Sequence, residues 1–337
     1  MNGAAPGCTT AALDSRLPDA APAPARAVPG GRGLSVAGAA TAMFLVGTLA
    51  PVSDLIKEFP VYGGQALRYA AGAAVLFVVC MVMRLPFVRL TLRELGLLVA
   101  LTTLGLVLFS VSIVEAARYG GATLVGTLLG ATPLMLALAS GRRPSPRLLL
   151  GASAVGAGTV VATGLGTGGP IALAWAVTTL ICEVSFSLLA VTLLPKLGPI
   201  RTSAYATALA VPMFLIIGWV AHGTAMMRMP TVSEVLGFGY ISILVTVFAF
   251  LLWYSALQRL GTGKAGLFAG LIPIGTMITA MVVGLGMPTI GEWGGAVLVV
   301  AGIVIGLKAQ ESPAEDAGTR PPRVPATASS LSADSRR

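Results

Sequence analysis

Glu183 is the side chain in this sequence best placed to do chemistry, because it lies in the middle of a long apolar stretch. Steps of four residues from Trp175 reach Thr179, Glu183 and Ser187, so these groups share one face of a helix. A carboxylate in the middle of a bilayer is costly and usually faces the interior of a helix bundle. Burial favours its protonated form. Glu183 could therefore exchange a proton for a ligand, or it could stay protonated and hydrogen-bond a neighbouring helix.

Arg68 is the second candidate, and it lies in another apolar stretch beside Gln65 and Tyr69. A guanidinium offers paired donors that fit a carboxylate or a phosphate. Three roles are open from the sequence. Arg68 clamps an anionic group of a substrate, pairs with Glu183, or extends its head group to the membrane surface. We predict that this group and the Glu183 stripe form the substrate or proton pathway.

No pattern in the sequence indicates a metal site or an organic cofactor. The single histidine, His222, has no second ligand near it, and the three cysteines lack the spacing of a metal centre. A nucleotide-binding loop is also absent from the sequence. We therefore expect a protein without catalytic residues, metal or cofactor that is not an enzyme, with a membrane-embedded enzyme as the rival class.

The composition places the chain in a bilayer. Its 337 residues are 55% hydrophobic and 10% charged, whereas about 25% of residues are charged in soluble domains. A helix needs about 20 mostly apolar residues to cross a membrane. The sequence therefore predicts an all-α polytopic membrane protein with ten transmembrane helices, near residues 34–54, 62–83, 95–114, 120–140, 148–166, 171–194, 203–221, 235–257, 265–287 and 290–307.

Charge predicts the orientation of these helices. Residues 1–33 and 308–337 are rich in Pro, Ala, Ser and charged residues, as expected for disordered tails. Lys and Arg accumulate in cytoplasmic loops. If both tails are cytoplasmic, all 22 Lys and Arg residues lie on the cytoplasmic side except Lys57, Arg68, Arg118 and Arg228. We expect a multi-pass protein of the plasma or inner membrane, whose net charge of +9 reflects topology and not nucleic-acid binding.

An internal repeat organises the apolar region. The segment GTLLGATP at 126–133 has a counterpart in GLFAGLIP at 266–273, with both glycines and the proline in register. The sequence thus predicts two repeats, 34–166 and 171–307, with five helices each. Because five is odd, the second copy is inverted relative to the first. This is the plan of secondary transporters, whose sites lie near the midplane between the halves.

The repeated residues have physical roles in this plan. Glycines four residues apart allow a second helix to approach closely, and a proline frees the carbonyl one turn earlier. The same pattern would also fit a packing seam with a kink and no further role. We predict helix breaks and close packing at the repeated set, which consists of Gly126, Gly130, Pro133, Gly266, Gly270 and Pro273.

The paired segments GRRPSPRLLLGASAVGAGTVV and GMPTIGEWGGAVLVVAGIVIG, with Arg68 in QALRYAAGA, resemble the EamA-type branch of the drug/metabolite transporter superfamily over about 34–307. The resemblance implies efflux, or less often uptake, of small organic solutes such as amino acids or drug-like metabolites by alternating access. Glu183 is a departure, because an aromatic residue is common at that place in the family. The expected partners are a small-molecule substrate and the lipid bilayer, with protons as a candidate coupling ion. Substrate and oligomeric state stay open.

Overall fold

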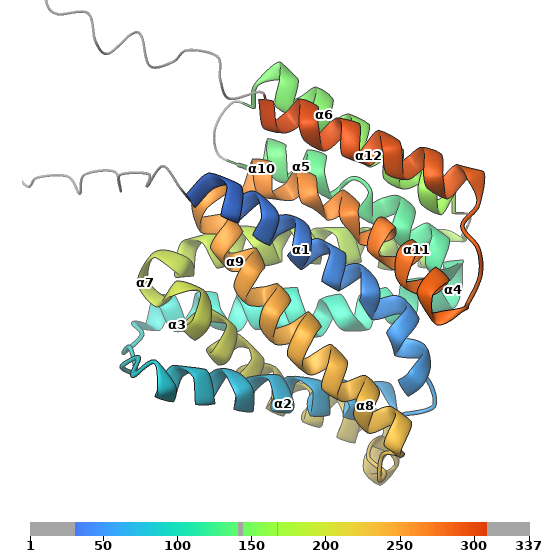
Figure 1. Cartoon of the computed structure of the whole chain (residues 1–337). Coiled ribbons are helices and arrows are strands. Elements are labelled where there is room, and N and C mark those ends of the chain that lie inside the picture. Colours follow the sequence, from blue (N-terminus) through green and yellow to red (C-terminus); the bar gives the residue numbers. More distant parts are fainter. Residues whose placement is uncertain (1–30, 141–143, 167, 309–337) are drawn as a thin grey trace, which may run out of the picture.

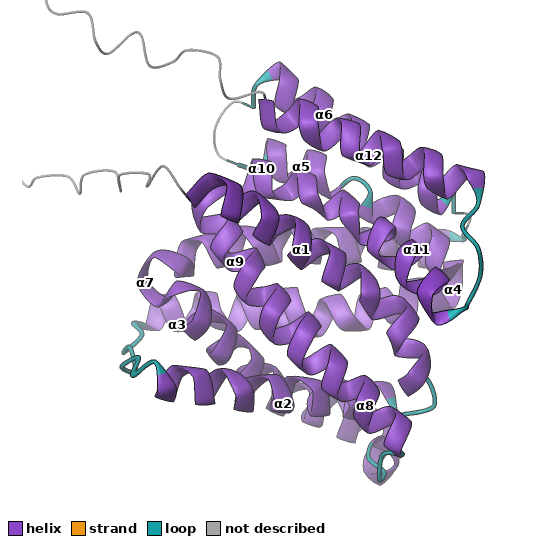
Figure 2. Cartoon of the chain, viewed as in Figure 1, coloured by secondary structure: helices purple, strands orange, loops and turns teal. Residues whose placement is uncertain are grey.

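The computed structural model describes residues 31–140, 144–166 and 168–308. These residues form helices joined by turns and loops, and no strand occurs among them (Figures 1 and 2). The predicted all-α class is therefore confirmed. The predicted tails lie outside the described residues except at their inner edges, where residues 31–33 and Lys308 are already helical.

In chain order the elements are α1 (Gly31–Val52), η1 (Ser53–Ile56), α2 (Val61–Val82), α3 (Leu92–Thr102), η2 (Thr103–Leu108), α4 (Phe109–Leu129), α5 (Thr132–Leu138), α6 (Pro146–Thr163), α7 (Pro170–His222), η3 (Gly223–Met226), α8 (Val232–Tyr240), η4 (Ile241–Phe248), α9 (Ala249–Leu260), α10 (Thr262–Gly266), η5 (Leu267–Gly270), α11 (Leu271–Val283) and α12 (Ile290–Lys308). Segments η2 and η4 are π-helical, and η1, η3 and η5 are 3₁₀ turns.

Eight helical segments in the described part of the chain are long and apolar enough to cross a membrane, compared with the ten predicted. The difference arises at two places. Leu124–Leu138 is apolar but shorter than the others, and Pro170–Met226 is continuous over 57 residues. Within it, Gly198 has φ 71° and ψ 170°, which is not helical, so α7 consists of two helices joined there.

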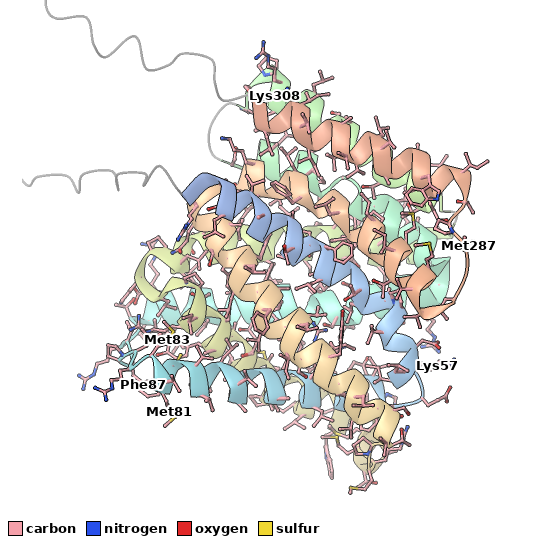
Figure 3. The ribbon with its side chains drawn as sticks, in the orientation of Figure 1. Lys57, Met81, Met83, Phe87, Met287 and Lys308 are labelled. Atoms are coloured by element: carbon pink, nitrogen blue, oxygen red, sulfur yellow. The ribbon has the colours of Figure 1, made fainter. Side chains whose placement is uncertain are left out.

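Loops that the charge pattern assigns to opposite sides of the membrane lie at opposite ends of the bundle. Met83, Phe87 and Lys308 lie at one end of the helices, and Lys57 and Met287 lie at the other (Figure 3). The loop between α2 and α3 therefore shares an end with the last residue of α12. This relative placement agrees with the predicted alternation of loops.

The same local features recur in α3–α4 and α8–α9. Thr91 and Glu94 form a capping box at the start of α3, and Thr231 and Glu234 form one at the start of α8. In such a box the threonine hydroxyl and the glutamate carboxylate each accept a backbone N–H at the helix start. Each helix then passes into a π-helical segment.

A pair of glycines shows the same correspondence in the backbone. Gly121 has φ 75° and ψ 164°, and Gly261 has φ 76° and ψ 164°. Other residues rarely adopt positive φ because a Cβ atom would clash with the backbone. Both glycines break a helix, and Gly121 to Gly261 is the same 140-residue offset that relates Gly126 to Gly266.

Helices α6 and α12 lie side by side along one edge of the bundle (Figure 1). A Cβ atom added at Gly151 would lie 2.6 Å from the Cα atom of Gly306 and 2.7 Å from the carbonyl oxygen of Gly302. A Cβ atom at Gly158 would lie 2.8 Å from the carbonyl oxygen of Gly295. The two backbones are thus in direct contact, as small residues permit between membrane helices.

Candidate functional site

Arg68 is held inside the bundle by a neighbouring helix. Its side chain is 8% exposed, and its Nε donates to the Thr246 hydroxyl at 2.7 Å. Thr246 lies in the π-helical η4 and donates in turn to the carbonyl oxygen of Ile241, five residues earlier, at 3.1 Å. The guanidinium also donates to the Gln65 amide oxygen at 3.5 Å. The guanidinium also lies 5.2 Å from the Tyr69 ring centre. Gln65 and Tyr69, which the sequence predicted near Arg68, are therefore its neighbours.

The burial of Arg68 bears on the three roles that the sequence left open. At 8% exposure, the side chain is covered by neighbouring residues. The ion pairs found among the described residues include none between Arg68 and Glu183. Thr246 and Gln65 are neutral, so no carboxylate compensates the positive charge of Arg68 in this part of the chain. The described residues thus show Arg68 hydrogen-bonded to neutral partners, and its binding of an anionic group stays a prediction.

The Glu183 stripe on α7 is buried on both sides of the carboxylate. Thr179 and Ser187 are 0% exposed, whereas Glu183 keeps some accessible surface. Thr179 donates to the Ser112 hydroxyl on α4 at 3.1 Å, and to the carbonyl oxygen of Trp175. The Ser187 hydroxyl is buried without a hydrogen-bond partner. The stripe thus packs on α4 at one end and leaves polar groups unsatisfied toward the other.

An aromatic cluster that the sequence did not reveal adjoins this stripe. The Phe186 ring lies 5.5 Å from Tyr254 and 5.6 Å from Phe250, between centroids, and Tyr69 stacks on Phe214 at 5.5 Å. Four of these rings, those of Tyr69, Phe186, Phe214 and Tyr254, belong to one buried core cluster. The core therefore joins the neighbourhood of Arg68 on α2 to the neighbourhood of Glu183 on α7.

Tyr254 carries a second unpaired hydroxyl within this core. Its side chain is 0% exposed, and its hydroxyl has no hydrogen-bond partner, as for Ser187. Leaving a buried polar group unsatisfied costs about 1–3 kcal/mol, so each such group needs an explanation. The hydroxyls of Ser187 and Tyr254 are therefore candidates for hydrogen bonds to a bound molecule.

The repeated glycines all lie at close helix contacts. A Cβ atom would meet the Thr163 methyl group at 3.0 Å if added at Gly126, and the Gly156 carbonyl oxygen at 3.3 Å if added at Gly130. At Gly266 it would meet Leu136 at 3.0 Å. At Gly270 it would overlap the side chain of Val155. These contacts support the predicted packing role.

The two repeated prolines lie where helices change. Pro133 is in the first turn of α5, directly after α4 ends at Leu129. Pro273 is the third residue of α11, which follows the 3₁₀ turn η5. A proline is tolerated in a first turn because its missing N–H has no partner there in any case. The interruptions in the two repeats thus coincide with the repeated Gly-x-x-Pro pattern.

A bundle with eight helical segments that are long and apolar enough to cross a membrane, in the part of the chain that the structure describes, defines a multi-pass membrane protein. Residues 170–307 match the EamA-like transporter family. Over 256 residues, the chain is 26% identical to the uncharacterized transporter YetK of Bacillus subtilis (strain 168). The aligned region covers 72% of this chain and 78% of that protein. A solved crystal structure aligns with a TM-score of 0.70 at 21% identity, over 83% of this chain and 100% of the other, which shows the shared fold alone. The match over residues 170–307 and the relative named as a transporter confirm the resemblance to the EamA-type branch of the drug/metabolite transporter superfamily that the sequence indicates.

Proposed function

We propose that this transporter exports a small amino acid-like or drug-like metabolite by alternating access, in exchange for protons. The observation that carries the proposal is the buried core, where no ion pair of Arg68 is found among the described residues and the hydroxyls of Ser187 and Tyr254 are among those without partners. Interior charges and unsatisfied polar groups are expensive in a membrane protein and mark substrate or ion pathways. Uptake of a small solute is the alternative direction.

The proposal includes ten spanning helices. Here α7 contributes two spans that reverse at Gly198, and Leu124–Leu138 contributes a short one. As a single straight helix, α7 would be about 80 Å long at about 1.5 Å per residue, far more than the roughly 30 Å of hydrocarbon. Both termini then face the cytoplasm, as the distribution of Lys and Arg favours.

Inverted repeats are supported by the way α6 contacts α12. When the two repeats are aligned on Pro144 and Pro288, Gly151 corresponds to Gly295, and Gly158 corresponds to Gly302. Gly151 packs on Gly302, while Gly295 packs on Gly158. Reciprocal contacts of this kind are what a two-fold axis between equivalent surfaces requires. The segment matched to the family, residues 170–307, also coincides with the proposed second repeat.

In this mechanism Arg68 binds an anionic group of the substrate, and Glu183 takes up a proton when substrate leaves. Tyr254 and Ser187 hydrogen-bond the bound solute, and the rings around them contact its apolar part. Two inverted repeats can exchange conformations, so the core opens to one side of the membrane at a time. Proton uptake at Glu183 would couple this exchange to the proton gradient.

The test is the extracellular metabolite profile of cells that produce the protein, compared with cells that produce Glu183→Gln, at two external pH values. We expect a small metabolite to accumulate outside with the wild-type protein and its export to fall about tenfold or more with Glu183→Gln. Glu58→Gln is the matched control, because Glu58 is exposed in the loop after η1.

Three outcomes contradict parts of the proposal. Normal and equally pH-dependent export by Glu183→Gln would exclude the proton role. Depletion of a solute from the medium, instead of accumulation, would establish uptake. An equal loss of export in Glu58→Gln would show that the effect is not specific to the buried carboxylate.

A further inference from the structure

The end of α2 is shaped to form a pocket. Arg84 follows the helix with φ 52°, a left-handed conformation usually taken by glycine. Its N–H donates to the carbonyl oxygen of Met81 at 3.0 Å, and the N–H of Leu85 donates to that of Cys80 at 2.9 Å. These two bonds close the helix end as a Schellman motif. The chain is thereby turned so that Leu85 and Phe87 lie against the last turns of α2.

The pocket between this turn and α7 has a volume of about 300 Å³, at the small end of ligand-binding pockets. Its wall is apolar except for one charged side chain, which α7 supplies directly after the break at Gly198. The residues that matter most for its chemistry are Phe77, Met81, Leu85, Phe87, Arg201 and Tyr205.

Arg201 is the charged group, and it lacks a compensating anion. Its Nε is buried without a hydrogen-bond partner, and its Nη1 reaches only the Leu197 carbonyl oxygen at 3.5 Å. The ion pairs found in the described part of the chain do not include Arg201. Lys196, which lies on the other side of the break at Gly198, is by contrast paired with Glu94 at 2.6 Å. A cation with an unsatisfied donor in an apolar pocket provides a site for an anion.

Part of the apolar wall of the pocket is exposed. Met81 is 77% exposed and Phe87 is 79% exposed, although both line the pocket. In Figure 3 they lie with Met83 at one end of the bundle. Arg89, on the connection between α2 and α3, and Arg93, in the first turn of α3, are exposed as well. Apolar side chains beside basic ones at a helix end mark the boundary between hydrocarbon and head groups.

We propose that this pocket binds an anionic phospholipid, with its phosphate on Arg201 and the start of an acyl chain against Phe77, Met81 and Phe87. The guanidinium fork fits a phosphate in two-point contact. The positive charge of Arg201 inside the pocket favours a lipid with net negative charge over a zwitterionic one, as on the cytoplasmic leaflet. This site lies at the end of the bundle and is independent of the core proposed for transport.

The test is native mass spectrometry of the purified protein, released from nanodiscs that contain equal amounts of phosphatidylglycerol and phosphatidylcholine. We expect the wild-type protein to retain phosphatidylglycerol preferentially. Arg201→Gln should lower that preference roughly fivefold, as expected for losing one cation next to the head group. Arg93→Gln is the matched control, since Arg93 is exposed at the same end and does not line the pocket. It should keep the preference.

Two further measurements test whether the apolar wall contributes to binding and whether free phosphate competes with the lipid. Phe87→Ala keeps Arg201 but removes part of the apolar wall, so it should also lower retention, and it serves as the test if Arg201→Gln does not fold. Inorganic phosphate added in excess should leave the lipid bound. Equal retention by Arg201→Gln and the wild-type protein would overturn the proposal. So would an equal loss in Arg93→Gln, unchanged retention in Phe87→Ala, or displacement of the lipid by inorganic phosphate.

Discussion

Arg68 shows how a charged side chain inside this bundle is held by a hydroxyl from a distant part of the sequence. Its Nε donates to Thr246, which is 178 positions away in the sequence and fully buried. The Thr246 hydroxyl can accept this bond while donating its own proton to Ile241. The contact therefore fixes the guanidinium of α2 against the π-helical segment η4.

Thr246→Val tests this contact, because valine has nearly the same shape and no hydroxyl. The substitution leaves the Arg68 donor without its partner in a buried place. We expect it to lower the free energy of unfolding by about 2 kcal/mol, since an unsatisfied buried donor costs about 1–3 kcal/mol. Reversible unfolding in detergent micelles measures the change.

Thr192→Val is the control for this substitution, because Thr192 is exposed and its hydroxyl bonds only to Leu189 in its own helix. Its effect should stay within about 0.5 kcal/mol. An equally small effect of Thr246→Val would mean that Arg68 is held by other groups.

At this scale the sequence indicated Glu183 and Arg68 as candidate site residues but gave no sign of the polar side chains that surround them. Glu183 and Arg68 are conspicuous because ionisable residues are rare within apolar stretches. Thr246, Ser112 and Tyr254 are ordinary residues in a sequence, and their roles come from helices that the fold brings together. The Ser112–Thr179 bond, for example, joins residues 67 positions apart.

Among the helices, the contact of α6 with α12 depends on glycine. The backbones touch at Gly151, where a side chain would meet both the Cα atom of Gly306 and the carbonyl oxygen of Gly302. These are backbone atoms, so they cannot move aside as the end of a flexible side chain can. A methyl group at this position must push the two helices apart.

We expect Gly151→Ala to lower the free energy of unfolding by about 1–3 kcal/mol through overpacking. Gly294→Ala on α12 is the matched control, because no atom lies within 4 Å of the Cβ that it adds. It should be neutral or stabilising by up to about 1 kcal/mol, since alanine favours helix over glycine. Thermal unfolding of the two variants distinguishes them, and equal effects would contradict the close contact.

The sequence predicted the elements unevenly. Helix positions followed from the length of apolar stretches, and the break in α7 coincides with the Gly198–Pro199 pair, a strong local signal. The capping boxes at Thr91 and Thr231 also have a readable pattern, a threonine with glutamate three residues later. The π-helical segments η2 and η4 have no such pattern, because they depend on packing against neighbouring helices.

Across the whole molecule, the arrangement of ends makes a prediction about topology. With the native cysteines replaced, single cysteines at Lys57 and His222 should react with an impermeant reagent in intact cells. Single cysteines at Arg89 and Lys196 should react only after permeabilisation. The proposed reversal at Gly198 places Lys196 on the side of the membrane opposite His222, because the second half of α7 returns to the side where the first half begins. Labelling of positions 196 and 222 from the same side would contradict this reversal.

The overall plan was predicted from the sequence through the repeated Gly-x-x-Pro segments and the alternation of charge. The membrane class followed from the composition and the apolar stretches, and the resemblance to EamA-type transporters is confirmed. The shape of the core could not be predicted, because its rings come from α2, α7 and α9, and no local pattern links Tyr69 to Phe214 or Phe186 to Tyr254.

The matching backbones at Gly121 and Gly261 have a consequence for the ancestry of the chain. Their torsion angles agree within about one degree, whereas the residues that follow them, Ala122 and Thr262, differ. Side chains can be exchanged by single mutations, but a positive φ admits little besides glycine. The similarity left by an ancestral duplication would therefore persist longest at such turns. Related chains should keep both glycines after the rest of the two halves has diverged.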